Sequence, residues 1–494
     1  MKTPGNAKTP CRFCHIRAKR APNGHYYVPH NDFQTHRGGL CLRNNLRAQI
    51  ELSIDAGSQW ADRVGVTRKS ILLRLPSLHF PRSFTIDLMH CILLNTIKNI
   101  WKVWDEGNTG SNDDNDNEDG PQAFYVGDHD KDIISNVLRM SRFNVPAALG
   151  TLPQNLEHFR QFKAAEWKTV LELYGPSLLY EHIALNAWKN FRDLCRIWIT
   201  AINYRISNSD VVRLKNAIAD FVRDYEKIYH AGDPERLPAC SINIHWLLHL
   251  PACIEDNGPS RYWWSFPLER YCYEVKQTAR SKSHMGISMA NMLIRIEQYN
   301  IVNLLQTPGV RHPDLTDQHQ RFPVLNSIIA KPHHHPHLPL NRRLRRRLAQ
   351  DLNRPTDDSL ATDLQYYRRC KLTTEVTIGS GPSQYDSEIN RNNHFVCYRP
   401  PGRRCRFGTV YGFIQVQSDD FQYALVQKWE GVAADLDADQ ITYSREDGRW
   451  ELIRVAYIRC LVGVLTEFDV HLPSRATKMI IGALGEVRSS DDVE

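Results

Sequence analysis

The chain has 494 residues, more than one hydrophobic core usually organises, so we expect two or three domains. Its 42% apolar and 24% charged residues are typical of a globular protein, and no segment has the length and apolar content of a membrane span. Since the sequence lacks the apolar region of a signal peptide, we expect its twelve cysteines in a reducing compartment, as thiols or metal ligands and not as disulfides.

The net charge of +7 is distributed unevenly along the chain. Residues 1–50 hold nine Lys and Arg against one acid, Asp32, so this segment alone carries +8. A second basic run lies at Arg342–Arg347, and an acidic tract at Asp105–Asp119 contains seven carboxylates. We interpret the acidic tract as a disordered insert. A solvated loop is the simplest interpretation of the arginine run, although uneven basic charge also indicates which surface meets a polyanion.

The first two segments of the chain differ in texture. Residues 1–41 are rich in Gly, Pro, His and basic residues, and we predict loops and metal-bound backbone there. Residues 42–305 follow the 3.6-residue period of helices. The predicted helices span 84–104, 156–173, 177–203 and 210–229. For the last of them, Asn208 and Ser209 are candidate N-caps, and Gly232-Asp233-Pro234 follows its end.

The remainder of the chain predicts a linker and a β domain. Residues 306–390 are dense in Pro, His and Arg, a composition typical of a linker. Residues 391–494 contain short β-rich runs that indicate a small antiparallel barrel or sandwich, which we interpret as an interaction domain. The runs are 395–398, 407–415, 423–429, 450–464 and 478–481. The expected fold class is therefore mainly α with a C-terminal β module.

Two short motifs have the residue types and spacing of a metal site. Two cysteines separated by two residues, Cys11 and Cys14, can grip one ion through a tight turn. His245 and His249 are four residues apart, so on a helix they would project from the same face. Spacing leaves three interpretations open: one long-range site of all four residues, a local finger completed by His25 and His30, or free thiols with hydrogen-bonded core histidines.

A resemblance to a known family rests on six strings taken in chain order. They are Cys11–Cys14, Gly24–Tyr27, Asp87–His90, Lys163–Trp167, Ile242–Leu250 and Trp264–Arg270. In this order the strings resemble the large transposase of CACTA (En/Spm-like) DNA transposons, in the form abundant in fungi. The resemblance covers about residues 5–305, and the last two strings are its most specific part.

This resemblance implies a DDE recombinase, with a partial RNase H-like core and a large all-helical insertion braced by zinc. Carried over to this sequence, the zinc ligands are Cys11, Cys14, His245 and His249, and Glu269 is the last member of the catalytic triad. Two Mg²⁺ or Mn²⁺ ions need more carboxylates than one. The family pattern places two aspartates upstream of Cys11, so we expect this N-terminally truncated chain to be catalytically incomplete as written.

Other residues near these motifs have two interpretations each. Asp87 is the first candidate for a replacement carboxylate, with His90 beside it, but a helix-capping Asp is the simpler interpretation. Trp263 and Trp264 would either stack on an unpaired DNA base or fill a joint between helices. Candidate contacts to DNA phosphates surround Glu269, and they are Arg261, Arg270, Lys276, Arg280 and Lys282.

The sequence therefore predicts a transposase-derived nuclear protein that binds double-stranded DNA. We expect no association with membranes, and a homo-oligomer is left open. Zinc is the expected structural cofactor, with Mg²⁺ or Mn²⁺ only if the chain is catalytic. Two alternatives stay open. One is a domesticated DNA- or chromatin-binding protein without nuclease activity, and the other is an active endonuclease that uses other carboxylates.

Overall fold

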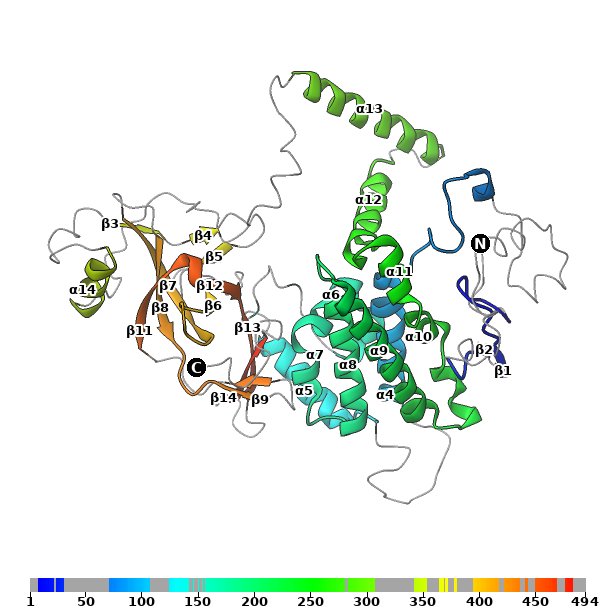
Figure 1. Ribbon diagram of the computed structural model, residues 1–494, viewed down its shortest axis with the longest axis horizontal. Helices are drawn as coiled ribbons and strands as arrows, with labels where there is room; N and C mark the ends of the chain where they lie inside the picture. The colour runs from blue at the N-terminus through cyan, green and yellow to red at the C-terminus, as the bar shows by residue number, and fades with distance from the viewer. Residues whose placement is uncertain are drawn as a thin grey trace, which may run out of the picture.

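A computed structural model of the chain (Figure 1) is mainly helical, with antiparallel sheets at its C-terminal end. It describes residues 8–21, 24–30, 71–106, 124–141, 145, 150, 153, 156–279, 283–306, 342–352, 364–367, 369–371, 377–379, 394–416, 422–435, 440–442, 449–468 and 476–482. The interpretations made for residues 42–70, for most of the acidic tract and for the His/Pro run lie outside these residues. No described helix is both long and apolar enough to cross a membrane.

The helical domain follows the predicted helices, with breaks that the periodicity did not reveal. The predicted helix 84–104 is a π-helical segment η2 (Met89–Thr96) followed by α4 (Ile97–Glu106). The predicted helix 177–203 is divided between α7 (Gly175–Leu179) and α8 (Leu185–Ala201). The remaining elements of this part are η1 (Ile71–Arg74), α5 (Asp128–Ser141), η5 (Leu156–Gln161), α6 (Ala164–Thr169), η6 (Val170–Tyr174), α9 (Asn208–Tyr225), η7 (Glu226–His230), η8 (Pro234–Ala239), α10 (Ile242–Leu247), α11 (Leu250–Asn257), η9 (Ser260–Tyr262), α12 (Phe266–Gln277) and α13 (Met285–Gln306).

Buried tryptophans form much of the helical core. Trp104, Trp188 and Trp198 are each no more than 1% exposed. A buried indole N–H needs an acceptor, and each of these finds one. The Nε1 of Trp104 donates to the Tyr229 hydroxyl at 3.1 Å, and that of Trp188 to the Pro176 carbonyl at 2.7 Å. These bonds fix the orientation of large side chains whose burial contributes to the hydrophobic stabilisation of the domain.

The π-helical start of the second described helix has a local cause. In a π-helical turn the backbone bonds span five residues, and two polar side chains of η2 repeat that spacing. Thr96 Oγ1 donates to the carbonyl of Cys91 at 2.9 Å, and Asn95 Nδ2 donates to the carbonyl of His90 at 2.6 Å. The wider turn therefore keeps its carbonyl groups satisfied.

The N-cap of helix α9 lies one residue before the two predicted caps. Its N-cap is Ser207, whose Oγ accepts a bond from the backbone N–H of Asp210 at 3.2 Å, while Asp210 Oδ2 accepts from the N–H of Ser207 at 2.9 Å. The prediction of Asn208 or Ser209 as N-cap was wrong. The reciprocal pair needs an acid three residues after the cap, and only Ser207 has Asp210 at that distance.

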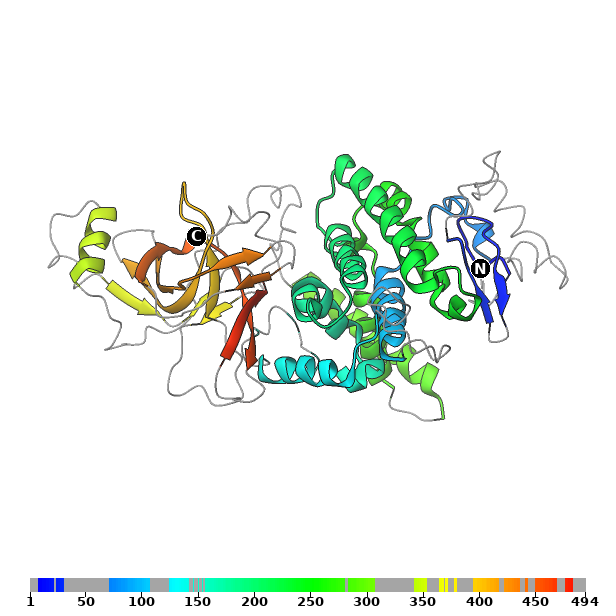
Figure 2. The same ribbon diagram turned by 90° about the horizontal axis from the view of Figure 1, so that it is seen from below.

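The described part of residues 1–41 belongs to the helical domain and does not form a separate unit. The hairpin of β1 (Lys19–Ala21) and β2 (Gly24–Tyr26) lies beside α10 in Figures 1 and 2. The N–H of Tyr27 donates to the carbonyl of Cys240 at 3.0 Å, just before α10. Phe13, Ile16 and Tyr27 are buried in the same core cluster as the helices.

The C-terminal part is an antiparallel β module, as predicted. Its larger sheet has the strand order β11–β8–β7–β6–β12, with β3 paired to β7. Within the described strands this order ends at β11 and at β12, so the sheet is open and not a closed barrel. The bounds are β3 (Leu364–Tyr367), β6 (Phe395–Tyr398), β7 (Arg406–Val416), β8 (Gln422–Lys428), β11 (Trp450–Arg454) and β12 (Ile458–Leu461), with η12 (Val455–Tyr457) between the last two. Next to this sheet are the hairpin β4 (Arg369–Lys371) and β5 (Thr377–Gly379) and a second sheet of β9 (Ala433–Asp435), β10 (Gln440–Thr442), β13 (Gly463–Phe468) and β14 (Ala476–Gly482).

The segment 306–390 is more than the predicted linker. It contains α14 (Arg342–Asp351) as well as β3, β4 and β5, and β3 adds a strand to the main sheet. Leu344 and Leu348 of α14 are buried against Ile414 and Leu425 of that sheet. The β module thus begins at least as early as residue 342. The prediction of a linker was wrong here because α14 has few apolar residues. Few are needed, since the main sheet supplies the other side of the apolar contact.

We predict that Ser207→Ala lowers the free energy of unfolding of the helical domain by about 1 kcal/mol, because α9 loses its capping bond. Ser209→Ala is the matched control and should change it by less than about 0.5 kcal/mol, since this serine lies inside the first turn. The measurement is thermal unfolding of the full chain followed by circular dichroism. Equal effects of the two substitutions would show that the cap is not at Ser207.

Candidate metal centre

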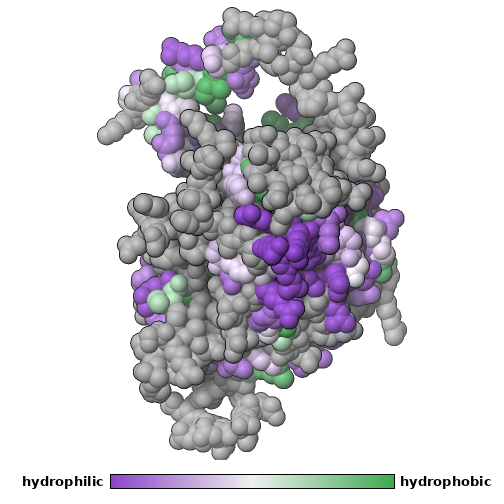
Figure 3. Space-filling view, turned by 90° about the vertical axis from the view of Figure 1, so that its left-hand side faces the viewer, coloured by the Kyte–Doolittle hydropathy of each residue, from purple (hydrophilic) through white to green (hydrophobic). Residues whose placement is uncertain are grey.

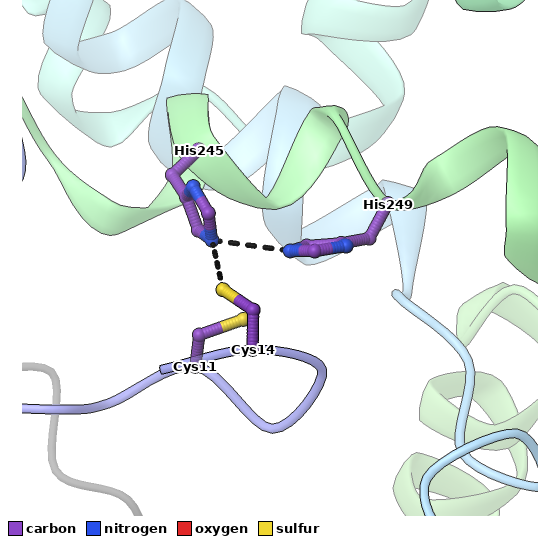
Figure 4. Close-up of side chains that lie close together, drawn as sticks. All are labelled: Cys11, Cys14, His245 and His249. Carbon is purple, nitrogen blue, oxygen red and sulfur yellow. Dashed lines mark hydrogen bonds between the residues drawn. The ribbon is translucent and has the colours of Figure 1, made fainter. Parts of the chain in front are cut away.

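Four metal-binding side chains from the two ends of the helical domain meet at one point (Figure 4). One ligand atom from each of Cys11, Cys14, His245 and His249 lies within 4.8 Å of the other three. Cys14 Sγ is 3.2 Å from His245 Nε2, which is 3.1 Å from His249 Nε2. All four residues are buried, so the long-range set that the sequence left open is the one that the fold brings together.

Local structure aims each pair at the common point. The cysteines lie in a loop that closes with a bond from the N–H of Ala18 to the carbonyl of Lys8 at 2.7 Å, and the N–H of Phe13 points at Cys11 Sγ at 3.4 Å. His245 lies on α10, whereas His249 is the N-cap of α11. The two histidines are therefore not on one continuous helix, yet the intervening turn preserves helical backbone angles at His249 and hence the shared face.

The spacing of these atoms fits a metal ion. With metal–ligand bonds of about 2.0–2.3 Å, the corners of a tetrahedral site lie roughly 3.3–3.8 Å apart. The observed contacts of 3.1 and 3.2 Å are slightly shorter than that. All four ligand atoms lie within 4.8 Å of one another, so binding an ion would require some of them to move apart and others to move closer. Because all four donors come from buried protein side chains, such a site would be closed, with no position left open for water or substrate.

A second contact fixes which nitrogen of His245 faces the site. Its Nδ1 lies 2.6 Å from the backbone carbonyl of His30. A carbonyl only accepts, so Nδ1 carries a proton, and Nε2 is the nitrogen that points toward Cys14 and His249. This is the arrangement in which an imidazole binds a metal through Nε2 while a backbone oxygen holds its other nitrogen.

The electrostatic environment favours the metal-binding protonation states. Burial raises the pKa of the Cys11 thiol, but the hydrogen bond with Cys14 and the nearby His249 and His245 together hold that pKa well below its usual value. Burial lowers the pKa of His249, and the neighbouring Cys11 opposes this only in part. The lowered pKa of Cys11 favours its thiolate, and the lowered pKa of His249 favours its neutral ring; these are the forms of each residue that bind metal ions.

The local finger of Cys11, Cys14, His25 and His30 does not form. His25 lies on β2, away from the four-ligand cluster. His30 is fully buried beside the site, but it contributes its carbonyl and not its ring. Neither ring nitrogen of His30 has a hydrogen-bond partner among the described residues, and the ring packs edge-on against Tyr225. The sequence allowed a local site because only a short chain separates the two cysteines from His25 and His30. Packing of the helical core instead brings His245 and His249 to the cysteines.

Glu269 lies in the first turn of α12 and is 59% exposed. His90 Nε2 is 3.6 Å from its Oε1, and the other ring nitrogen of His90 bonds to Asp87. Asp87 also accepts from the N–H of Ser265 at 2.9 Å, the residue that precedes α12. Its carboxylate accepts from the N–H groups of Met89 and His90 as well, both at 3.3 Å. Asp87 is therefore the capping and bracing residue that its simpler interpretation proposed, and it sets where α12 begins.

The candidate DNA contacts divide into three groups. Arg261 is partly buried, stacks over Tyr204 and Trp264 at 4.3 and 4.9 Å, and donates to the carbonyl of Ile202 at 2.8 Å. It is thus used in packing. Arg270 and Lys276 are exposed on α12 beside Glu269. Arg280 and Lys282 lie outside the described residues.

Trp263 and Trp264 fill a joint, the simpler of their two interpretations. Trp264 stacks on the core residue Trp198 with ring centroids 6.3 Å apart. The Nε1 of Trp263 donates to the carbonyl of Gly258 at 2.9 Å. Both rings are partly buried against the helical core, which ties the start of α12 to α8.

A pocket of about 430 Å³ was not anticipated from the sequence. It lies between α4, η5 and the start of α10, and its lining includes Lys98, Lys102, Arg160, Asn99 and Asn243. Glu106 forms ion pairs with Lys102 and Arg160 at its rim. No spacing motif links these residues, since three separate elements contribute them.

Comparisons of the chain with protein-family models, with curated proteins and with solved structures found no match. Function is therefore inferred from the chemistry of the site and from the arrangement of the residues around it.

We predict that the purified chain binds one transition-metal ion per molecule, measured by elemental analysis after dialysis. Cys14→Ser and His249→Ala should each lower the metal content to a small fraction of that value and lower the melting temperature, because each removes a ligand. His25→Ala is the matched control and should retain the metal. If His25→Ala lost as much metal as His249→Ala, the four-ligand site described above would be wrong.

A second prediction separates the two carboxylates near α12. Asp87→Ala should lower the free energy of unfolding by roughly 1–3 kcal/mol, because it leaves the N–H of Ser265 without its acceptor. Glu269→Gln should change it by less than about 0.5 kcal/mol, since Glu269 is an exposed surface residue. Denaturant titration of the metal-loaded chain measures both. A destabilising Glu269→Gln would contradict this assignment of roles.

Proposed function

We propose that this chain is a transposase-derived DNA-binding protein of the DDE recombinase type, braced by a structural zinc ion. The observation that carries the proposal is the convergence of Cys11, Cys14, His245 and His249. The resemblance to CACTA transposases implied this set of ligands from the sequence alone, although the two motifs that supply them are more than two hundred residues apart. Agreement between the implied set and the observed cluster supports the resemblance in the region that it covers.

Zinc is the metal that suits this donor set. Two thiolates and two imidazoles in a closed tetrahedral arrangement are typical of structural zinc, whereas Mg²⁺ and Ca²⁺ prefer oxygen ligands. A zinc ion here would join the N-terminal loop to α10 and α11. Its role would be to hold the fold together, because a site with four protein ligands has no open position for chemistry.

The zinc-braced helices lead directly to the Glu-bearing helix. From His249 the chain continues through α11 and η9 to α12, where Glu269 lies in the first turn. In the proposed DDE ancestry, α12 is the helix that delivered the last carboxylate of an RNase H-like core. Within the described residues, Glu269 does not belong to any cluster of three or more metal-binding side chains. The proposal is therefore DNA binding in the nucleus, without strand transfer by the described residues.

An active Mg²⁺- or Mn²⁺-dependent endonuclease is the second candidate, and one observation favours it. His90 lies between two carboxylates, with Asp87 on one ring nitrogen and Glu269 near the other. A histidine between two carboxylates can act as a proton donor, and the carboxylates can bind a cation. It ranks second because the oxygens of Asp87 already accept from Ser265, Met89 and His90. A domesticated chromatin protein without nuclease activity differs from the first proposal only in its biological use.

The DNA-facing surface of the helical domain is proposed to be α12. Arg270 and Lys276 are exposed there, and cations on an accessible helix are the groups that neutralise DNA phosphates. Binding of this kind falls steeply with salt, because each phosphate contact releases condensed counterions.

The experiment measures binding of the full zinc-loaded chain to a fluorescent DNA duplex of about 30 base pairs as a function of salt. We expect the double variant Arg270→Gln/Lys276→Gln to reduce the slope of log affinity against log salt by about 2. Glu269→Gln should bind at least as well as the unmodified chain, since it removes a negative charge.

A matched control removes two exposed cations elsewhere, Lys189→Gln/Lys215→Gln, and should leave the slope unchanged. An unmodified chain that shows no salt-dependent binding would overturn the proposal. Nicking of the duplex with Mn²⁺ that disappears in Glu269→Gln would replace it with the endonuclease alternative.

A further inference from the structure

The short helix α14 holds five arginines on a fixed surface of the β module. Its apolar residues Leu344, Leu348 and Ala349 are buried against the main sheet, together with Tyr423 and Leu452. All five of its arginines are exposed, and they are Arg342, Arg343, Arg345, Arg346 and Arg347. The arginine run interpreted from the sequence as a solvated loop is thus an amphipathic helix anchored by its apolar side.

Within the part of the chain that the structure describes, the charges of this helix are not balanced by ion pairs. Asp351, at its C-terminal end, is the one acidic residue within α14. Among the described residues, none of the five guanidinium groups forms an ion pair with a carboxylate. Figure 3 shows strongly hydrophilic residues gathered on the side of the molecule where α14 lies in Figure 1.

Helical spacing brings these like charges close together. Arg342 and Arg346 are four residues apart, as are Arg343 and Arg347, so each pair lies on neighbouring turns of one face. Like charges at this spacing oppose helix formation. The packing of Leu344 and Leu348 on the sheet holds the helix in place against that repulsion. A polyanion bound along α14 would remove the repulsion.

We propose that α14 is a second DNA-contact surface, which binds the phosphate backbone of a duplex and rests on the DNA-binding function proposed above. A helix of ten residues is about 15 Å long, a length over which duplex DNA presents on the order of nine phosphates. The guanidinium group matches phosphate because its planar donors bind two oxygens at once. The contact reads backbone charge and not base sequence, since an arginine cluster on one exposed helix offers no groove-specific pattern.

The surface is separate from the one on α12. Figure 1 shows α14 at the far side of the β module from the helical domain that carries α12. Substitutions on the two helices share no partner, so their effects on binding should add. This separation lets one experiment test the two surfaces independently.

The test uses the full zinc-loaded chain with the same 30-base-pair duplex, a single-stranded DNA of equal length and an RNA duplex of the same sequence. In the triple variant Arg343→Gln/Arg346→Gln/Arg347→Gln, the salt slope for duplex DNA should fall by about 2–3 relative to the unmodified chain. Glutamine keeps a high helix propensity, so α14 should remain folded. Arg343→Lys/Arg346→Lys/Arg347→Lys should retain most of the slope, because charge is preserved.

The control is Lys189→Gln/Arg205→Gln/Lys215→Gln, which removes the same charge from exposed positions of the helical domain. If the α14 triple variant behaves like this control while the α12 double variant loses slope, the α14 inference is overturned and the proposed function stands. If only the α14 variant loses slope, the inference stands and α12 is not the main interface. Binding to RNA duplex alone, with the same dependence on α14, would overturn the assignment to DNA.

Discussion

The contact with the greatest consequence for the helical domain is the meeting of two sulfur and two nitrogen atoms in its interior. Burying thiolates beside imidazoles at 3.1–3.2 Å is costly without a cation, because burial disfavours bare charge. The proposed metal ion would convert that cost into a link between Cys14 and His245, which are separated by 231 positions. Closing so long a loop costs only moderately more entropy than closing a short one, so a single ion can stabilise the whole domain.

The position of α12, the helix that carries Glu269, is related to the same cluster. His245 lies on α10 and His249 caps α11, and the chain then turns through η9 into α12. Two further contacts fix the beginning of α12, since Asp87 accepts from Ser265 and Trp264 stacks on Trp198. These contacts fix the position of Glu269 in the first turn of α12, while its side chain remains exposed to solvent. Within the described residues, Glu269 joins no cluster of three or more metal-binding side chains, so this part of the chain does not form a complete two-metal site.

The sequence predicted the helical and β-rich halves and all four ligands, but not which ligands belong together. Spacing alone fits His25 and His30 as well as His245 and His249, since ligand type and separation do not encode which side chains the core will bury. Only the resemblance favoured the distant pair. The π-helical segment η2 and the cap at Ser207 involve side-chain hydrogen bonds between residues three to five positions apart. The 3.6-residue period of apolar residues does not reveal such bonds. Helix α14 was missed because two leucines four residues apart are too few to outweigh five arginines until the sheet beneath them is known.

The two helices proposed to contact DNA differ in charge, which bears on how the protein would hold DNA. Helix α12 carries Arg270 and Lys276 together with Glu269 and Glu274, so its formal charge is zero. Helix α14 carries five arginines and one aspartate, a formal charge of +4. Since non-specific affinity grows with the number of phosphates neutralised, the β module would supply more of the binding free energy, and α12 would serve to orient the duplex near Glu269. Under the proposed function, α14 would retain affinity for DNA without any contribution from Glu269, because its arginines lie on the β module and Glu269 lies on the helical domain.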